Sequence, residues 1–241
     1  MEKDKFEKIG KEVIQCEINA LRNLKSNVGS NFSKVVKLIL SCKNGKIIIS
    51  GVGKSGIIGK KWSATLSSVG VSSFFLDPSN ASHGDMGQIT SGDIVILISN
   101  SGESEELKNI IQYVTRNRNI KLIGITSKKN SILYKNADLS FLMSQAKEAG
   151  PENIVPTSST TTQLALGDAI AIACMKYNNF TAFDFKKVHP VVVRGVLKPI
   201  LVDLAIKKSY FKYINLKVLT INQYLFFMLL FIRKTLNNSS N

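Results

Sequence analysis

Two hydrophobic patterns alternate along most of this chain of 241 residues. Five short apolar runs predict β-strands at residues 46–50, 72–76, 94–98, 121–125 and 139–143. Apolar residues at three- and four-residue steps predict helices at residues 3–26, 56–69, 103–116, 131–136 and 160–176. Another helix is predicted through Val35 to Leu40, with Asn31 or Ser33 as its cap and its end near Asn44.

The predicted strands are apolar on both faces and are separated by helices. Such strands lie in parallel sheets that are covered by helices on both sides. The predicted fold class is therefore α/β, a doubly wound parallel five-stranded sheet flanked by helices in an α/β/α sandwich. Because ligands of these sheets bind outside the carboxyl ends of the strands, the loops that follow each strand are where a site is expected.

Composition and cysteine usage limit the class of protein. Hydrophobic residues make up 44% of the chain and charged residues only 20%, which excludes a disordered chain. The charged N-terminus lacks the apolar core of a signal peptide, so we expect a cytoplasmic location. Cys16, Cys42 and Cys174 lie in apolar helical segments without metal-ligand spacing, which predicts buried free thiols.

The net charge of +15 is unevenly distributed, because residues 191–241 supply +7 of it. A strongly basic protein often binds nucleic acid or an anionic membrane. Here the remaining positive charge forms no basic stripe interleaved with aromatic residues, so we expect no nucleic acid partner. A phosphorylated small molecule explains the charge equally well.

The turn after the first predicted strand, Gly51-Val-Gly-Lys-Ser-Gly56, leads into a helix. Backbone N–H groups at a helix N-terminus bind anions, and glycines allow a ligand to approach closely. The same glycines satisfy G-x-G-x-x-G, and Asp77 lies about where a dinucleotide site has its ribose-binding acid. By itself the turn is compatible with a phosphate site, a nucleotide site or a tight structural turn.

Two further turns rich in hydroxyl groups open predicted helices. They are Ser99-Asn-Ser-Gly-Glu-Ser104, after the third strand, and Pro156-Thr-Ser-Ser-Thr-Thr-Thr162, before the last long helix. Helix capping accounts for one or two such side chains, not for both clusters. A dinucleotide site would use only the Gly51–Gly56 turn. The three turns together therefore favour a phosphate ester as the ligand.

These segments together resemble a SIS domain, and more narrowly the arabinose-5-phosphate isomerases. The resemblance covers about residues 8–190 in family order and is carried by Gly51–Gly56, Ser82–Gly87, Ser99–Ser104, Ala146–Ala149, Thr157–Thr161 and His189–Pro190. It implies interconversion of D-ribulose 5-phosphate and D-arabinose 5-phosphate on the route to 3-deoxy-D-manno-octulosonate for lipopolysaccharide or capsule. It also implies a homo-oligomer, a tetramer in the family, and no cofactor.

The resemblance assigns roles to individual residues. The positions that match the family's catalytic set are Lys54, Glu106, Glu148 and His189. The expected substrate-binding residues are Gly53, Ser55, His83, Ser99, Asn100, Ser101, Glu103, Ser104, Thr157, Ser158, Ser159, Thr160 and Thr161, with the phosphate on the Ser/Thr turns. His83 also matches a histidine at the site mouth that is associated with inhibitory divalent zinc. In family structures the site lies between subunits, and the neighbouring chain contributes the histidine.

The chemistry of an aldose–ketose isomerase requires these residue types. A carboxylate base moves a proton between C1 and C2 through an enediolate, and a positive group such as Lys54 stabilises the developing oxyanion. A histidine such as His189 can open a cyclic sugar. The sequence leaves open whether Glu106 or Glu148 is the base. The structural alternative for each glutamate is a carboxylate on the protein surface. For His83 it is a loop histidine that is hydrogen-bonded to backbone.

The resemblance ends after Pro190. In the family a Gly-Gly turn and a pair of CBS domains follow, whereas Val191-Val-Val-Arg-Gly-Val follows here and residues 191–241 resemble no CBS domain. We therefore divide the chain into a SIS domain at 1–190 and an atypical basic and apolar tail at 191–241. The composition of the tail suggests a frameshifted or truncated gene, which DNA sequencing across codons 185–200 would test. The alternative is an amphipathic tail on a membrane or a partner.

Two other functions compete with the arabinose-5-phosphate isomerase. One is a non-catalytic or inactivated SIS protein that binds a phosphosugar, and the other is an isomerase of a heptose or hexulose phosphate. A SIS transcription factor is disfavoured because residues 1–45 leave no room for a helix-turn-helix domain. Loss of the Gly-Gly turn can misplace His189, so we expect phosphosugar binding to be more robust than turnover.

Overall fold

The structure is a computed structural model that describes residues 2–189. The chain divides into two units, Met1–His189 and Pro190–Asn241. Our predictions for the tail at 191–241 lie outside the described residues, so they stay predictions.

One parallel sheet forms the centre of the fold, with strand order β2-β1-β3-β4-β5. Its strands are β1 (Ile47–Gly51), β2 (Ser73–Phe75), β3 (Ile94–Ile98), β4 (Lys121–Thr126) and β5 (Leu139–Leu142). All five predicted strands are confirmed, with bounds shifted by one residue at most. Every residue of β1 and β3 is buried, as expected for central strands covered on both faces.

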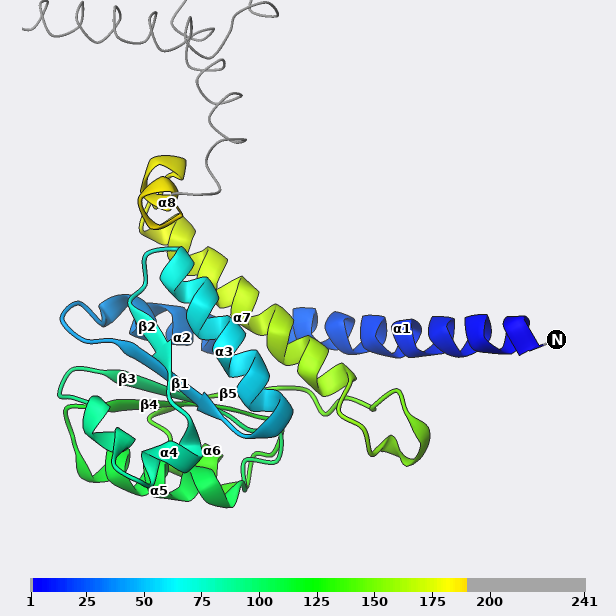
Figure 1. Ribbon diagram of the computed structural model, residues 1–241, viewed down its shortest axis with the longest axis horizontal. Helices are drawn as coiled ribbons and strands as arrows, with labels where there is room; N and C mark the ends of the chain where they lie inside the picture. Colours follow the sequence, from blue (N-terminus) through cyan, green and yellow to red (C-terminus); the bar gives the residue numbers. More distant parts are fainter. Residues whose placement is uncertain (1, 190–241) are drawn as a thin grey trace, which may run out of the picture. The chain divides into compact units, whose positions relative to one another are not determined.

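Helices cover both faces of this sheet, which confirms the doubly wound α/β fold (Figure 1). One face packs against α2 (Ser30–Ser41), α3 (Gly53–Ser68) and α7 (Ser158–Tyr177), and α1 (Glu2–Asn27) packs on α7. The other face packs against α4 (Pro78–Ala81), α5 (Glu105–Arg116) and α6 (Ile132–Asn136). Side chains alternate between the two cores along each strand, so Ile47 and Ile49 face α3 while Ile48 faces α5.

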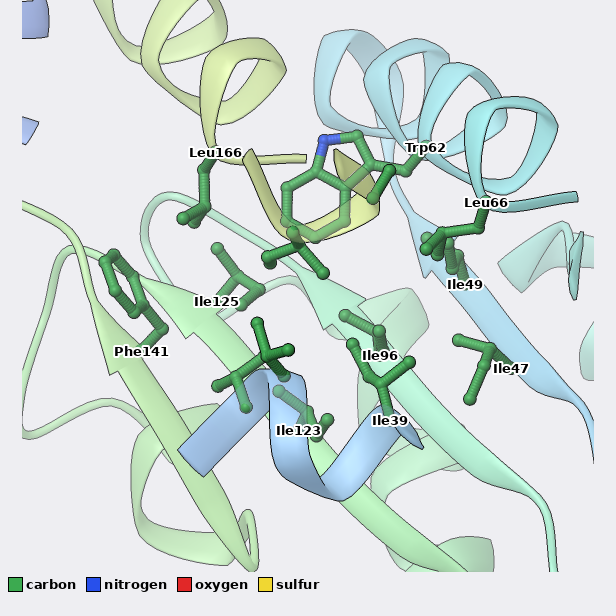
Figure 2. Close-up of a cluster of buried hydrophobic side chains, with 14 of the residues drawn as sticks. Ile39, Ile47, Ile49, Trp62, Leu66, Ile96, Ile123, Ile125, Phe141 and Leu166 are labelled. Carbon is green, nitrogen blue, oxygen red and sulfur yellow. The ribbon is translucent and has the colours of Figure 1, made fainter. Parts of the chain in front are cut away.

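The core on the α3 side is built around the Trp62 indole. Figure 2 shows Trp62 from α3 and Leu166 from α7 packed over the strand residues Ile96 and Ile125. All four side chains are at most 1% exposed. The Trp62 Nε1–H donates to the backbone carbonyl of Gln163, 2.9 Å away, so its one polar group is satisfied inside the core.

Asp93 joins the amino-terminal ends of β1 and β3. Its buried carboxylate accepts hydrogen bonds from the backbone N–H groups of Lys46 (2.7 Å) and Thr90 (2.8 Å) and from the Thr90 hydroxyl (3.0 Å). The Lys46 ammonium lies 3.3 Å from the same carboxylate. This one side chain thereby fixes where two central strands begin.

Three features differ from the sequence predictions. Neither Asn31 nor Ser33 caps α2, because the helix begins at Ser30 with Gly29 in the N-cap position. The short helix α4 and the helix α8 (Ala182–Val188) were not predicted, although Thr181 and Asp184 form a capping box that marks the start of α8. In α1 the apolar residues Phe6, Ile9 and Ile14 are exposed, because the first half of the helix extends beyond α7 (Figure 1).

The free thiols were predicted correctly, but their burial was not. All three cysteines are free; Cys174 is buried, whereas Cys16 and Cys42 are only half-buried. Among the described residues, no helix is both long and apolar enough to cross a membrane.

Candidate active site

The carboxyl-terminal edge of the sheet brings the predicted turns together. The strands are parallel, so the segments after β1, β3, β4 and β5 all emerge at this edge. Figure 1 shows the N-termini of α3 and α7 on the same side of the sheet. The sequence-based expectation that these loops form one region is confirmed by the topology.

Close backbone packing requires glycine at two positions of the Gly51–Gly56 turn. A Cβ on Gly56 would lie 2.5 Å from the carbonyl oxygen of Gly51, and a Cβ on Gly51 would lie 2.9 Å from that of Ile98. Gly53 has a positive φ of 57° and opens α3, so the exposed Lys54 follows in the first turn of the helix. The half-buried Ser55 lies beside it.

The dinucleotide interpretation of this turn is not supported, because Asp77 has a structural role. Its carboxylate accepts hydrogen bonds from the backbone N–H groups of Ser79 (3.0 Å) and Asn80 (3.4 Å) and caps α4. A carboxylate used as an N-cap stabilises the helix that it precedes.

The Ser99–Ser104 turn is tightly organised. The Ser99 hydroxyl accepts a hydrogen bond from the Gly102 N–H (3.0 Å) and lies 3.0 Å from the Ser104 hydroxyl. Ser101 Oγ accepts from the Glu103 N–H at 3.3 Å. Ser104 precedes α5 without capping it through its side chain, so the first N–H groups of α5 face the turn. Hydroxyl and N–H donors around one helix start are suited to a phosphate.

The loop after β4 supports this turn. The hydroxyls of Ser127 (2.8 Å) and Thr126 (3.3 Å) donate to the carbonyl oxygen of Asn100. A Cβ on Gly102 would lie 2.2 Å from Ser131 Oγ, and Gly102 has a positive φ of 67°. These supporting residues were missed in the sequence analysis, although Ser127 and Ser131 also follow a predicted strand and could have been found there.

Glu103 was predicted to bind substrate, but its carboxylate is engaged elsewhere. It accepts a hydrogen bond from the backbone N–H of Ile132, 2.9 Å away, at the start of α6. A carboxylate at a helix N-terminus is stabilised by the helix dipole. In this structure Glu103 therefore joins the Ser99–Ser104 turn to α6.

Glu148 lies in a buried site at the N-terminus of α7. Its side chain is 7% exposed, and its Oε2 accepts hydrogen bonds from the Thr157 N–H (2.7 Å), the Thr157 hydroxyl (3.1 Å) and the Ser159 N–H (3.2 Å). The Thr157 hydroxyl in turn accepts from the Ala149 N–H at 2.9 Å. The segment after β5 is thus bonded to the start of α7.

The net effect of this environment is to lower the pKa of the Glu148 carboxyl. Burial acts in the opposite direction and would raise the pKa, but hydrogen bonds from the Ser159 hydroxyl and from the Thr157 and Ser159 N–H groups outweigh it. Glu148 is therefore ionised at neutral pH although it is buried. An ionised carboxylate is the form that can accept a proton.

The Thr157–Thr161 run was predicted to hold phosphate, and here it holds a carboxylate. The N–H groups of Thr157 and Ser159 donate to Glu148, and the hydroxyls of Thr160 and Thr162 donate to the backbone carbonyls of Thr157 and Ser159. Ser158 and Ser159 are buried. The anion that this helix start binds in the structure is thus Glu148 itself.

Glu106 and His83 are exposed and lie on neighbouring segments. Glu106 is in the first turn of α5, and on the same helix Asn109 Nδ2 donates to the Ser82 hydroxyl (3.0 Å) beside His83. Within residues 2–189 no three His, Cys, Asp or Glu side chains gather as a metal site. The surroundings of His83 in one chain therefore do not by themselves supply a zinc site.

His189 is far from Glu148 within one chain. Glu148 lies at the N-terminus of α7, and His189 follows α8 beyond the other end of that 20-residue helix, which is about 30 Å long. The His189 imidazole stacks on Phe185 with ring centroids 3.8 Å apart. The structure thus gathers the segments of Lys54, Ser99–Ser104, Glu106 and Glu148 at one edge, and His189 is not among them.

Comparison with known proteins identifies the family. A family model described as SIS domain matches residues 39–173. The chain is 44% identical over 183 residues to the probable arabinose 5-phosphate isomerase of Haemophilus influenzae, covering 76% of this chain and 54% of that protein. It is 44% identical over 185 residues to the arabinose 5-phosphate isomerase KdsD of Escherichia coli K12, and the match covers 77% of this chain and 56% of that protein. The chain thus spans about half the length of these relatives.

A solved structure from Escherichia coli CFT073, determined in complex with arabinose 5-phosphate, has the same fold. Its TM-score is 0.75 at 36% identity, and the match covers 79% of this chain and all of that one. The family model and this match agree with the SIS resemblance found in the sequence. The chain belongs to the SIS-domain family.

Proposed function

We propose that this protein interconverts D-ribulose 5-phosphate and D-arabinose 5-phosphate. The similarity to arabinose 5-phosphate isomerases, and to a structure solved with arabinose 5-phosphate, supports this substrate pair. The product would serve 3-deoxy-D-manno-octulosonate formation for lipopolysaccharide or capsule. We place the reaction in the cytoplasm.

The buried, ionised Glu148 is the observation that carries the proposal. Isomerisation requires a base that removes the C1 proton of the ketose, leaving an enediolate, and returns a proton to C2 of the aldose. Glu148 is held in place at the sheet edge by hydrogen bonds from Thr157 and Ser159, whereas Glu106 is exposed. This difference favours Glu148 over Glu106 as the base.

We assign the substrate phosphate to the Ser99–Ser104 turn and the start of α5. This turn follows β3, and Glu148 follows β5, with β4 between them. Neighbouring strands lie about 4.8 Å apart, so the carboxyl ends of β3 and β5 are separated by roughly 10 Å, a span that a five-carbon sugar phosphate bridges. The phosphate would sit on one segment and C1 and C2 would face the other.

Lys54 and His189 complete the proposed machinery. Lys54 follows β1, which neighbours β3, and its ammonium would stabilise the enediolate oxygen. His189 would open the cyclic form of the aldose. Because His189 lies about a helix length from Glu148, we propose that another subunit contributes it, in a homo-oligomer. The exposed apolar residues of α1 are consistent with an interface.

Turnover of ribulose 5-phosphate by the purified protein tests the function. Wild type should form arabinose 5-phosphate, and Glu148→Ala and Lys54→Ala should each lose activity while the phosphosugar still raises the melting temperature. No turnover by the wild type, with thermal stabilisation retained, would instead support a non-catalytic phosphosugar-binding protein. Unchanged turnover in both variants would contradict the assignment of the site.

A further inference from the structure

The peptide group between Lys147 and Glu148 is held by side chains on both sides. Its carbonyl oxygen accepts a hydrogen bond from the Cys16 thiol, with Sγ 3.2 Å away. Its N–H, which belongs to Glu148, donates to the side-chain oxygen of Asn153. The two ends of one peptide plane are therefore bonded to residues from two separate parts of the chain.

Cys16 reaches this peptide from α1. The same thiol accepts a hydrogen bond from the Ser158 hydroxyl at 3.6 Å, in the first turn of α7. Cys16 thus contacts both segments that surround the Glu148 carboxylate, one just before Glu148 and the other at the helix start that binds it. The packing of α1 along α7 fixes the position of the thiol.

Asn153 reaches the peptide from the loop between β5 and α7. Asn153 and its neighbour Glu152 both have left-handed backbone conformations, with φ of 61° and 55°. Residues other than glycine adopt this conformation at an energetic cost and mostly where their surroundings require it. Here the conformation turns the Asn153 amide back toward the Glu148 N–H.

Holding a peptide plane at both ends restricts rotation about the bonds beside it. With this plane held, rotation about the Glu148 N–Cα bond, which is its φ, is what remains to set the direction in which the side chain leaves the backbone. The hydrogen bonds at the α7 N-terminus fix only the far end of that side chain. The backbone before Glu148 and its carboxylate are thus held by separate sets of hydrogen bonds.

We propose that Cys16 and Asn153 are positioning residues that clamp the Lys147–Glu148 peptide and so aim the Glu148 carboxylate at the substrate. The inference rests on the proposed function, in which Glu148 is the base. Small displacements of a catalytic group strongly reduce rate, so the clamp should affect turnover more than substrate binding.

Kinetics of four single variants and one double variant test the clamp. Asn153→Gly permits the left-handed backbone and removes the acceptor, and should lower kcat about 10- to 100-fold with little change in KM. Cys16→Ala should lower kcat less, about 3- to 10-fold, because a thiol is a weak donor. Asn153→Asp and Cys16→Ser keep the bonding atoms and should restore most of the rate. The double variant Cys16→Ala/Asn153→Gly should lose less than the product of the single losses.

Two matched controls separate the clamp from general damage. Asn179→Gly changes another asparagine with a positive φ, 51°, at the other end of α7. Cys42→Ala removes another half-buried thiol that donates to a backbone carbonyl, that of Gly92, at the opposite edge of the sheet. Both controls should keep the wild-type kcat. Wild-type kcat in Asn153→Gly and Cys16→Ala, or equal losses in the controls, would overturn the proposal.

A stability cycle tests the clamp even if the wild type shows no turnover, which would count against the proposed function alone. Glu148→Gln should lower the melting temperature at pH 7 in the wild type, and by less in Asn153→Gly, because without the clamp the carboxylate is held less firmly in its hydrogen bonds at the α7 N-terminus. If the melting-temperature shifts of Glu148→Gln and Asn153→Gly are strictly additive in the double variant, Asn153 does not position Glu148.

Discussion

The Trp62 indole of α3 lies directly against the Cα of Gly167 on α7, so that no side chain of α7 separates the two at this point. A Cβ on Gly167 would lie 2.1 Å from Trp62 Nε1 and 2.3 Å from two further indole atoms. The indole is 1% exposed and donates to the Gln163 carbonyl, one turn earlier on α7. Gly167 thereby sets the distance between the two helices whose N-termini carry Lys54 and bind Glu148.

Gly167→Ala should therefore destabilise the protein although alanine favours helices. The added methyl group must push Trp62 or α7 aside, and overpacking of this kind costs about 1–3 kcal/mol. Urea denaturation measures the change. Gly10→Ala is the matched control, because Gly10 is also helical and a Cβ there meets nothing within 4 Å. The control should be neutral or more stable, by up to about 1 kcal/mol. Equal stability of the Gly167 variant and the wild type would contradict the packing described.

Asp93 should make stability depend on pH in the acid range. Burial favours a raised pKa, but the N–H groups of Thr90 and Lys46 and the Thr90 hydroxyl outweigh it, so the pKa of Asp93 lies below its usual value of 3.8. A lowered folded-state pKa means that this stabilisation is present above the unfolded pKa of about 3.9 and is lost as pH falls through the lower folded value. Thermal melts between pH 2 and 7 measure this loss.

Asp93→Asn should lower the free energy of unfolding at pH 7 by about 1–3 kcal/mol and flatten that acid dependence. The matched control is Asp138→Asn. Asp138 also accepts from a strand N–H, that of Leu122 at 2.8 Å, and pairs with Lys121, but its side chain is 39% exposed. We expect a smaller loss for Asp138→Asn, because solvent can replace its partners. A larger loss of stability in Asp138→Asn than in Asp93→Asn would contradict the role given to the buried Asp93 carboxylate.

Gly102→Ala should weaken phosphosugar binding. The glycine has a positive φ of 67°, and a Cβ would lie 2.2 Å from Ser131 Oγ and 2.8 Å from Thr126 Oγ1, so the Ser99–Ser104 turn must shift away from its support. We expect KM for ribulose 5-phosphate to rise about tenfold or more, equivalent to about 1.4 kcal/mol. Gly92→Ala controls for backbone strain, because Gly92 also has a positive φ, 90°, and open space around it. An unchanged KM in Gly102→Ala would argue against phosphate on this turn.

The sequence predicted the sheet and the edge of the sheet at which the site lies, but it did not predict the contacts within the site. Apolar runs buried on both faces specify parallel strands, and parallel strands specify the edge, so Glu148 and the Ser99–Ser104 turn could be placed near each other. The partner of Glu148 could not be chosen in advance, because a run of hydroxyl residues at a helix start suits a phosphate and a carboxylate equally. Cys16 contacts Lys147 across 131 residues, and no local pattern encodes such a contact.

The acid limb of the pH–rate profile should report the Glu148 environment. Because hydrogen bonds hold the Glu148 pKa below its usual 4.5, kcat/KM should fall only below about that pH. Thr157→Val removes the hydroxyl that donates to Oε2 at 3.1 Å, so the pKa should rise and the acid limb should move to higher pH. Thr162→Val, whose hydroxyl donates within α7, should leave the acid limb in place. An unmoved limb in Thr157→Val would mean that another group is the base.

The separation of His189 from Glu148 predicts that activity can be restored by mixing two inactive variants. Glu148→Ala and His189→Ala should each be inactive alone, because every site would lack one of the two groups. If a site combines Glu148 of one subunit with His189 of another, co-expressed or refolded mixtures contain some sites with both groups intact and should regain part of the wild-type turnover. A mixture of Glu148→Ala and Lys54→Ala is the control, because those two residues lie at the same edge of one chain and their loss should not be complemented. Restoration in the control but not in the Glu148/His189 mixture would reverse the assignment, since it would place Lys54 across the interface and leave His189 without a role in the site.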